Sequence, residues 1–190
     1  MGKLIEFMER EEALQLVKEN VKNDKLVKHM LAVEAIMREI AKYLNEDEER
    51  WGLVGLLHDI DFEITKEKQE MHGIKAEEIL KEKVDEELIR TIKAHNFEFT
   101  KVLPQTKIDY ALIAADQISG LIIAKALLMP SKKLEEVKVS SVEDGFKDKS
   151  FARRCDREKI LYCEKIGIKR DKFFELSLNA LKQIADELGL

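Results

Sequence analysis

Histidine and aspartate residues spread along this chain are of the types that bind transition-metal ions. The sequence has four histidines, and one of them is followed directly by an aspartate in the pair His58-Asp59. Imidazole nitrogens together with carboxylate oxygens suit Mn, Fe, Co, Ni or Zn, whereas calcium prefers oxygen ligands alone. The set includes no thiolate, so its chemistry favours an open, catalytic metal site over a structural zinc site. The candidate ligands are His29, His58, Asp59, His72, His95 and Asp116.

The segment GLLHDIDFE, residues 55–63, can be interpreted in two ways. It is an apolar run that ends in His58-Asp59, and Asp61 and Glu63 follow closely. In one interpretation a helix ends here and its acids face water. In the other the segment contributes to a metal site. Neighbouring residues cannot share one helix face, but at a helix end the backbone leaves the helix and both can reach one ion.

Helical periodicity turns several of these residues towards a core. His29 lies on the same apolar stripe as Val33 and Ile36. Asp116 lies within the apolar segment ALIAADQISGLIIAKALL, where a carboxylate is costly unless it is paired or binds a metal. A single histidine on an apolar face is more often an ordinary core residue than a ligand. Several inward histidines and aspartates from different helices, however, are how helical bundles build metal sites.

Almost the whole sequence has the three- and four-residue spacing of amphipathic helices, and no alternating β-branched run of useful length occurs. We therefore predict an all-α fold. Asn45 is typical of a helix N-cap, with Glu48 three residues later, and Asp85 and Pro130 mark another start and an end. The predicted helices span residues 24–44, 45–59, 71–83, 84–96, 106–128, 142–147, 156–166 and 169–188, with loops at 61–69 and 131–150.

The helices are expected to form a single domain, residues 1–190. Its core covers about residues 23–130, and a C-terminal helical part, about residues 131–190, packs on that core. Apolar residues recur in the C-terminal part, for example Leu161, Phe173 and Leu178. They can cover the domain's own core or that of a second copy, so the sequence leaves a homodimer open.

The balance of charge disfavours a protein that binds nucleic acid. There are 33 basic and 38 acidic residues, which gives a net charge of −5, and no helix resembles a basic recognition helix. The N-terminal stretch MGKLIEFMEREEALQ has no apolar run long enough for a signal peptide, and the most apolar helix contains Asp116 and Lys125. We therefore expect a soluble cytoplasmic protein that binds neither nucleic acid nor membrane.

The order His29, His58-Asp59 and Asp116 resembles the H…HD…D signature of the HD superfamily of metal-dependent phosphohydrolases. MHGIKAEEIL resembles the HG-x-x-A segment of the two-metal branch, TIKAHNFE the helix of its next histidine, and DYALIAADQISGLI the helix of its final aspartate. The HD enzymes that cleave diadenosine tetraphosphate are similar in all three places. Nearly the whole chain, including LLMPSKKLEEVKVSSVEDGFKDKSFARR, resembles uncharacterised bacterial HD hydrolases that read HDIDFE or HDIDYE.

The resemblance implies an HD-domain helical bundle with additional C-terminal helices. It also implies one or two divalent transition-metal ions, which would be Mn, Fe, Ni, Co or Zn. A first ion would be held by His29, His58, Asp59 and Asp116. His72 and His95 would hold a second ion with Asp59 as the bridging ligand, or would line the pocket and contact phosphate.

The sequence also departs from the widespread HD-I-G-K version of the motif. Asp61 and Phe62 replace its glycine and its phosphate-contacting lysine, and the paired histidines of the cyclic-dinucleotide branch are absent. Cyclic-dinucleotide activity is therefore a weaker implication, and the positive charge for a substrate must come from elsewhere. The candidates are Lys125, Lys132, Lys133, Lys149, Arg153 and Arg154, for which a solvated basic face is the alternative.

The function that the resemblance implies is a metal-dependent phosphohydrolase with a small, nucleotide-like phosphorylated substrate. Asp59 would act in catalysis as the bridging carboxylate. Asp61 or Glu63 would orient a histidine or donate a proton to the leaving group, or would simply be loop acids in water. Two other functions remain open, a dinucleoside polyphosphate hydrolase and a non-catalytic, metal-bound ligand-sensing domain.

Overall fold

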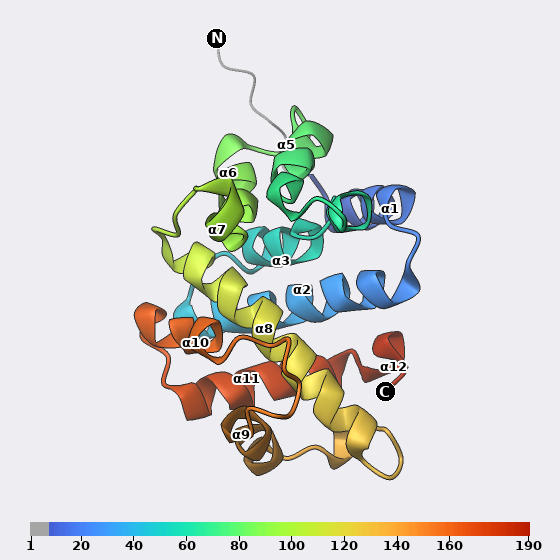
Figure 1. The fold of residues 1–190 in the computed structure, drawn as a ribbon, viewed down its shortest axis with the longest axis vertical. Coiled ribbons are helices and arrows are strands. Elements are labelled where there is room, and N and C mark those ends of the chain that lie inside the picture. Colours follow the sequence, from blue (N-terminus) through green and yellow to red (C-terminus); the bar gives the residue numbers. More distant parts are fainter. Residues whose placement is uncertain (1–7) are drawn as a thin grey trace.

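The computed structural model describes residues 8–190 of the chain. Residues 1–7, the first part of the stretch considered above for a signal peptide, lie outside the described residues. Every regular element within residues 8–190 is a helix, and no strand occurs among them (Figure 1). The predicted all-α fold is therefore confirmed.

The helices follow one another with short connections. In chain order the first part contains α1 Arg10–Asn20, α2 Asp24–Leu44, α3 Glu48–Leu57, α4 Phe62–Thr65, the 3₁₀ helix η1 Gln69–Met71, α5 Ile74–Leu80, α6 Glu86–His95, α7 Phe97–Thr100 and α8 Lys107–Leu128. The C-terminal part contains η2 Leu134–Glu136, α9 Val139–Lys147, α10 Arg157–Ile160, η3 Leu161–Ile166, α11 Arg170–Gln183 and α12 Ala185–Leu188.

The long helices α2 and α8 form the centre of the fold and pack against each other. The α3 helix lies so close to α2 that a Cβ atom added at Gly55 would lie only 2.9 Å from the Glu34 Cα atom. The α11 helix packs against both α2 and α8 (Figure 1). One apolar cluster contains Met30, Ile118 and Phe173, so the C-terminal helices share the core of the first part.

The link between α2 and α3 differs from the prediction. Asn45 is the C-cap of α2, in the left-handed conformation with a φ of 57°. Asp47 is the N-cap of α3, and its side chain accepts a hydrogen bond from the Arg50 amide at 3.0 Å. The predicted N-cap at Asn45 was wrong because asparagine suits both ends of a helix: its side chain can cap amides, and its backbone tolerates the left-handed conformation.

The predicted boundaries also miss several short breaks. The predicted loop at residues 61–69 contains α4, and the predicted helix at residues 156–166 changes to a 3₁₀ helix at Leu161. The last predicted helix ends at Gln183 and resumes as α12. By contrast, Asp85 is the predicted cap of α6, and its side chain accepts from the Leu88 amide. Apolar spacing is similar in α- and 3₁₀-helical turns, so the pattern does not reveal where one changes into the other.

Among the described residues, α8 is the one helix that is long and apolar enough to cross a membrane. Its most apolar window has a mean hydropathy of 1.7, and 56% of that window is buried in the fold. The core helix of a folded protein passes the same test of length and composition. Because α2, α6, α9 and α11 all pack against α8, this helix is part of the core of the fold, and it carries Asp116.

Candidate metal centre

Five parts of the fold bring ligand-type side chains to one place. They are His29 on α2, the pair His58-Asp59 at the end of α3, His72 after η1, His95 at the end of α6, and Asp116 on α8. Four of these residues are buried, namely His58, Asp59, His72 and His95. The side chains of His29 and Asp116 are 24% and 23% exposed. The centre therefore opens to solvent on the side of α2 and α8.

A first group of side chains lies around Asp116. The Nε2 atom of His29 lies 3.1 Å from Asp116 Oδ1 and 3.6 Å from Asp59 Oδ2. The Nε2 atom of His58 lies 3.5 Å from Asp59 Oδ1 and 3.9 Å from Asp116 Oδ1. Two imidazole nitrogens and two carboxylates thus face one small volume, and they are the residues that the resemblance implied for a first ion.

A second group lies on the other side of Asp59. The Oδ1 atom of Asp59 lies 3.2 Å from His72 Nε2 and 3.6 Å from His95 Nε2. The two Nε2 atoms are 2.9 Å apart. Asp59 belongs to this group and also to a group with His29 and His58, and within each group the ligand atoms lie within 4.8 Å of one another. A carboxylate shared in this way can bridge two ions.

Two of the histidine rings are fixed by hydrogen bonds on the side away from the centre. The Nδ1 atom of His58 lies 2.8 Å from the Gly55 carbonyl oxygen, and the Nδ1 atom of His95 contacts the Ile92 carbonyl oxygen. A carbonyl oxygen only accepts, so each Nδ1 carries a proton, and the Nε2 atom of each ring faces Asp59. The buried His58 Nε2 has no hydrogen-bond partner. A metal ion would satisfy this nitrogen.

Asp61 is fully buried and orients His72. Its Oδ1 atom lies 2.8 Å from His72 Nδ1, and its Oδ2 atom accepts hydrogen bonds from the amides of Gly73 and Ala76 at 2.8 and 2.9 Å. Gly73 has a φ of +90°, which favours glycine, and a Cβ atom there would lie 3.2 Å from the Thr100 side chain. The amides of the HG-x-x-A segment, at the start of α5, thus bind the Asp61 carboxylate. Of the roles expected for Asp61, the geometry supports the orienting one.

The pKa values in the centre move in opposite directions. Burial lowers the pKa of His58 to about 4. Burial also lowers the pKa of His72, but its hydrogen bonds with Asp59 and Asp61 outweigh this and raise the pKa to about 10. Burial alone would raise the pKa of Asp59, but His58 and His72 hold that pKa well below its ordinary value. Without metal, the charge of Asp59 is therefore balanced by a proton on His72.

The structure does not bring Glu63 to the centre. Its Oε2 atom accepts hydrogen bonds from the amides of Lys22 and Asn23, at 2.7 and 3.1 Å, immediately before α2. The bonds from Asn23 and then Lys22 lower the pKa of Glu63. A carboxylate at a helix start also interacts favourably with the helix dipole. Glu63 thus holds the start of the helix that carries His29, and its catalytic role stays a prediction.

Three of the six basic candidates lie along or beyond α8. Lys132 and Lys133 follow the end of that helix at Leu128, and this helix end lies about 18 Å along the axis from Asp116 at a rise of about 1.5 Å per residue. Among the described residues, neither lysine forms a hydrogen bond or ion pair with a candidate ligand. The Lys125 ammonium is nearer and lies 4.9 Å from the centroid of the Phe151 ring, which is a cation–π contact.

The other three basic candidates lie in the segment between α9 and α10. Lys149, Arg153 and Arg154 are all exposed. Lys149 and Arg153 line a cavity of about 230 Å³. The amide of Asp156, which also lines this cavity, donates a hydrogen bond of 2.8 Å to the Gln117 side chain on α8. This basic segment is therefore adjacent to the part of α8 that carries Asp116.

Two residues that sequence reasoning missed contact the predicted ligands. The Nε2 atom of Gln117 donates to Asp116 Oδ2 at 2.7 Å, and the Oγ atom of Ser119 lies 3.3 Å from His29 Nδ1. The one available signal was the presence of polar residues just after Asp116 in an otherwise apolar helix. These contacts support both ligands on the exposed side of the centre.

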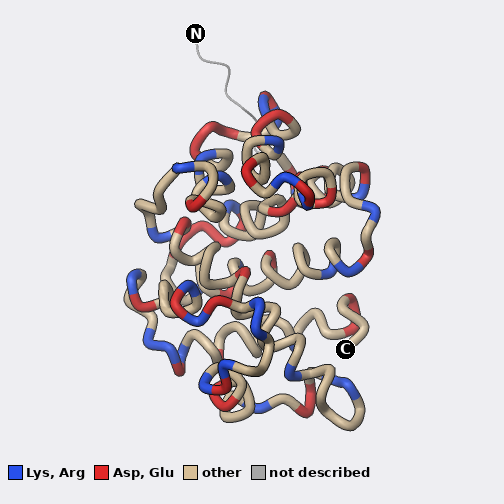
Figure 2. Tube along the Cα trace, viewed as in Figure 1, with Lys and Arg blue, Asp and Glu red and all other residues tan. Residues whose placement is uncertain are grey.

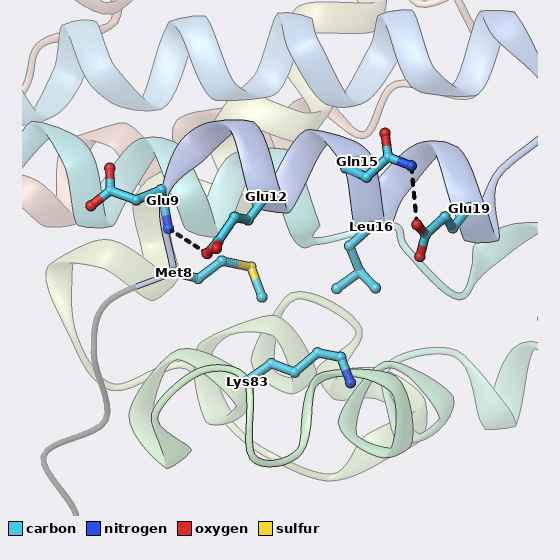
Figure 3. Close-up of a pocket in the computed structure, with 7 residues that line it drawn as sticks. All are labelled: Met8, Glu9, Glu12, Gln15, Leu16, Glu19 and Lys83. Carbon is cyan, nitrogen blue, oxygen red and sulfur yellow. Dashed lines mark hydrogen bonds between the residues drawn. The ribbon is translucent and has the colours of Figure 1, made fainter.

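A separate groove lies between α1 and the turn after α5 (Figure 3). Its volume is about 680 Å³, and Glu9, Glu12, Glu19 and Lys83 are among the residues that line it. Three glutamates make this groove unfavourable for a phosphate group, and none of the candidate ligands lines it. The groove is therefore not part of the candidate metal centre.

Comparison with known proteins identifies one family. The model of the HD domain matches residues 26–126, which is more than half of the 190-residue chain. The matched segment includes the four histidines together with Asp59 and Asp116. No curated protein and no solved structure matches the chain.

Proposed function

The chain belongs to the HD domain family, and on this premise we propose that it is a metal-dependent phosphohydrolase. Its substrate in this proposal is a nucleotide or a related small molecule with a phosphoester or phosphoanhydride bond. HD domains are generally metal-dependent hydrolases. The observation that carries the proposal is the convergence of histidines and aspartates from five parts of the fold, with Asp59 shared between two groups.

The residues present fit divalent transition-metal ions. A mixed set of nitrogen and oxygen donors suits Mn, Fe, Co, Ni or Zn, and the buried, unpartnered Nε2 atom of His58 fits a cation. When bound, such ions lower the pKa of water towards neutrality and neutralise charge on phosphoryl oxygens. A first ion would be held by His29, His58, Asp59 and Asp116, and a second by Asp59, His72 and His95.

The other residues of the centre orient these side chains and exclude water. Asp61 fixes the Nδ1 side of His72 and so turns the Nε2 atom of that ring towards Asp59. Behind the centre, every residue from Trp51 to Leu57 is buried. A wall of this kind lowers the local dielectric constant and strengthens the electrostatic interactions of the centre. A substrate would approach from the side where α2 and α8 are partly exposed.

A small phosphorylated molecule suits the charge distribution better than a nucleic acid does. Basic and acidic positions are interspersed along most of the chain, as the colours of the tube in Figure 2 show. Binding of a nucleic-acid backbone depends on a concentration of basic side chains. The local positive charge beside α8 comes from Lys125, Lys149 and Arg153. We propose that the protein acts in the cytoplasm on small nucleotide-like substrates.

The test combines metal content with turnover. Metal-stripped protein is loaded in turn with Mn, Fe, Co, Ni or Zn and offered a panel of nucleotides and other phosphoesters, and phosphate release is measured. We expect turnover that requires metal in the wild-type protein. The Asp59→Ala variant should lose both bound metal and turnover. Asp171→Ala is the matched control, because Asp171 is an exposed carboxylate on α11.

Two results would count against the proposal. Equal metal content in the wild type and the Asp59→Ala variant would contradict the assignment of Asp59 as a metal ligand. Stoichiometric metal without turnover on any substrate of the panel would favour the non-catalytic ligand-sensing domain instead.

A further inference from the structure

The segment between α9 and α10, residues 148–156, lies over α8 without regular secondary structure. We call it the strap. Figure 1 shows the chain crossing α8 here on its way from α9 to α10. The side chain of Asp148 accepts hydrogen bonds from the amide and the hydroxyl of Ser150, at 2.8 and 2.6 Å, which closes the first turn of the strap. The strap carries Lys149, Arg153 and Arg154, so it is locally basic.

The side chain of Arg157, at the start of α10, holds the strap in shape. Its guanidinium group donates hydrogen bonds to six backbone carbonyl oxygens, those of Gly145, Phe146, Asp148, Phe151, Ala152 and Cys155. The rigid, planar fork of five N–H donors lets arginine gather the carbonyl groups of a loop, which a lysine cannot do. The backbone conformation of the strap therefore depends on this one side chain.

The strap is also joined to the candidate metal centre. The amide of Asp156 donates to Gln117 Oε1 at 2.8 Å, and Gln117 Nε2 donates to Asp116 Oδ2 at 2.7 Å. One turn further along α8, a Cβ atom added at Gly120 would lie 3.0 Å from Cys155 Sγ. The strap thus lies on the part of α8 next to Asp116, and the Gln117 side chain links the two by hydrogen bonds.

Beside this junction the strap lines a cavity of about 230 Å³. Lys149, Arg153 and Arg157 contribute positive charge to its lining, and Asp156 and Glu158 are its two acids. The carboxylate of Asp156 is already bonded to amides in the first turn of α10. Within residues 8–190, neither Lys149 nor Arg153 forms an ion pair with an acidic side chain. Two cationic groups are therefore available for an anion in this cavity.

We propose that Lys149 and Arg153 form a second anion subsite, which binds the phosphate groups of the substrate that are not being cleaved. Ammonium and guanidinium groups bind phosphate oxygens through charge-assisted hydrogen bonds. The proposal rests on the proposed function and specifies its substrate class. That class is nucleoside di- or triphosphates and dinucleoside polyphosphates, in preference to nucleoside monophosphates, because a chain of phosphates supplies further anionic groups for Lys149 and Arg153 while one phosphate lies at the centre.

Arg157 is a positioning residue in this subsite. Its N–H groups are directed to backbone carbonyls, so it acts by holding the strap against Gln117 and contributes charge to the cavity wall. An Arg157→Lys variant keeps the positive charge but loses the planar set of five N–H donors. It should therefore weaken the subsite although it leaves Lys149 and Arg153 in the chain.

The first experiment measures binding without turnover. Calorimetry follows the binding of inorganic pyrophosphate and of orthophosphate to metal-stripped protein at low salt. The double variant Lys149→Ala/Arg153→Ala should bind pyrophosphate about tenfold more weakly, or worse, because two charge-assisted contacts are lost. The matched control is Lys42→Ala/Lys81→Ala, which removes the same charge from two exposed sites on α2 and after α5 and should bind as the wild type does.

The outcomes separate this proposal from the proposed function. Equal pyrophosphate affinity in the wild type and the strap variant would overturn the subsite, as would a wild-type protein that binds no pyrophosphate. Strap-dependent binding of pyrophosphate in a protein that shows no turnover with any metal would support the subsite and contradict the phosphohydrolase alone.

The second experiment measures the substrate preference of the metal-loaded protein. Both the strap variant and Arg157→Lys should raise the KM for nucleoside triphosphates about tenfold and leave kcat nearly unchanged, because the reacting phosphate is held at the metal centre. The KM for a nucleoside monophosphate should stay the same. A merely structural role of Arg157 would instead lower kcat equally for both substrates. A wild-type preference for monophosphates would overturn the proposal.

Discussion

Two buried carboxylates in the α2–α3 region are balanced in different ways. Glu34 on α2 is 3% exposed, and its Oε1 atom lies 2.6 Å from Arg10 Nε and 3.1 Å from Arg38 Nε. Asp59, just after α3, is 8% exposed, and its charged or chargeable neighbours are the four histidines. Arginine keeps its charge at every pH of interest, whereas histidine is charged only when a proton is held on the ring.

The difference distinguishes a structural ion pair from a centre whose side chains can bind a cation. At Glu34 the chain itself supplies permanent positive charge. At Asp59 it supplies titratable rings, an unpartnered nitrogen on His58 and a proton on His72. A divalent ion can take the place of that proton and satisfy that nitrogen at the same time. Burial of a carboxylate is therefore a poor indicator of a functional site until its partners are known.

The largest effect on stability is expected at Glu34. Glu34→Ala leaves Arg10 and Arg38 without this partner and should lower the free energy of unfolding of the metal-free protein by about 3 kcal/mol. Asp59→Ala should lower it by about 1 kcal/mol or less, because the histidines can become neutral. Urea denaturation measures both. A loss at Asp59 as large as the loss at Glu34 would contradict the comparison.

Added metal should stabilise the protein only when Asp59 is present. At a free metal concentration of about a hundred times the Kd, binding to the folded state contributes about 2.7 kcal/mol. Wild type and Glu34→Ala should both gain this amount, and Asp59→Ala should gain none. Thermal unfolding with added metal, and again with a chelator, shows the gain. An equal gain in Asp59→Ala would mean that the stabilising ion binds elsewhere.

Within the centre, Asp61 should matter for one ion only. Asp61→Asn disturbs the hydrogen bonds to His72, Gly73 and Ala76 and should weaken the second ion about 10- to 100-fold, with the first ion retained. A metal titration that resolves two sites, compared with wild type, measures this. Unchanged affinity at the second site would remove Asp61 from the orienting role.

Metal affinity should also depend on pH because of His72. Its pKa is raised to about 10 by Asp59 and Asp61 against burial, so the metal-free protein holds a proton there at neutral pH. Below pH 10 an ion must displace that proton, so affinity should rise with pH by up to about tenfold per unit, and each second ion should release about one proton. Calorimetry in two buffers of different ionisation enthalpy counts the proton. No release at pH 7 would contradict this charge state.

The smallest effect is expected at Glu63, whose carboxylate contacts the start of α2. Glu63→Ala removes the acceptor for the Lys22 and Asn23 amides and should lower the free energy of unfolding by about 1 kcal/mol. Because no candidate ligand contacts Glu63, metal content and kcat should stay close to wild type. A loss of turnover of a hundredfold with metal still bound would return Glu63 to the catalytic set.

The sequence predicted long helices well and short breaks poorly. The predicted helices at residues 24–44 and 106–128 agree with α2 and α8 to within one residue. Both have many turns of apolar spacing and a strong stop, so the pattern is unambiguous. Asn45 misled the prediction, because a cap residue does not show which helix end it closes until the backbone angle is known.

The candidate ligands show a similar division. Residue chemistry and helical periodicity were enough to single out the histidines and Asp116, and the resemblance grouped them. The sequence could not separate Asp61 from Glu63, two acids of the same segment. Asp61 turns inward to His72, whereas Glu63 turns to the start of α2. The contact of Gln117 with the strap was equally invisible, since its partner is 39 residues away in sequence.

By itself, the sequence determined the fold class and the set of side chains able to bind a metal, because helical period and ligand chemistry are local properties of a chain. Only the tertiary structure decided which of those side chains share one volume. The close approach of α3 to α2 at Gly55 and the placing of the strap on α8 set those distances. They depend on how helices far apart in sequence pack together, and that packing is settled by the whole core at once.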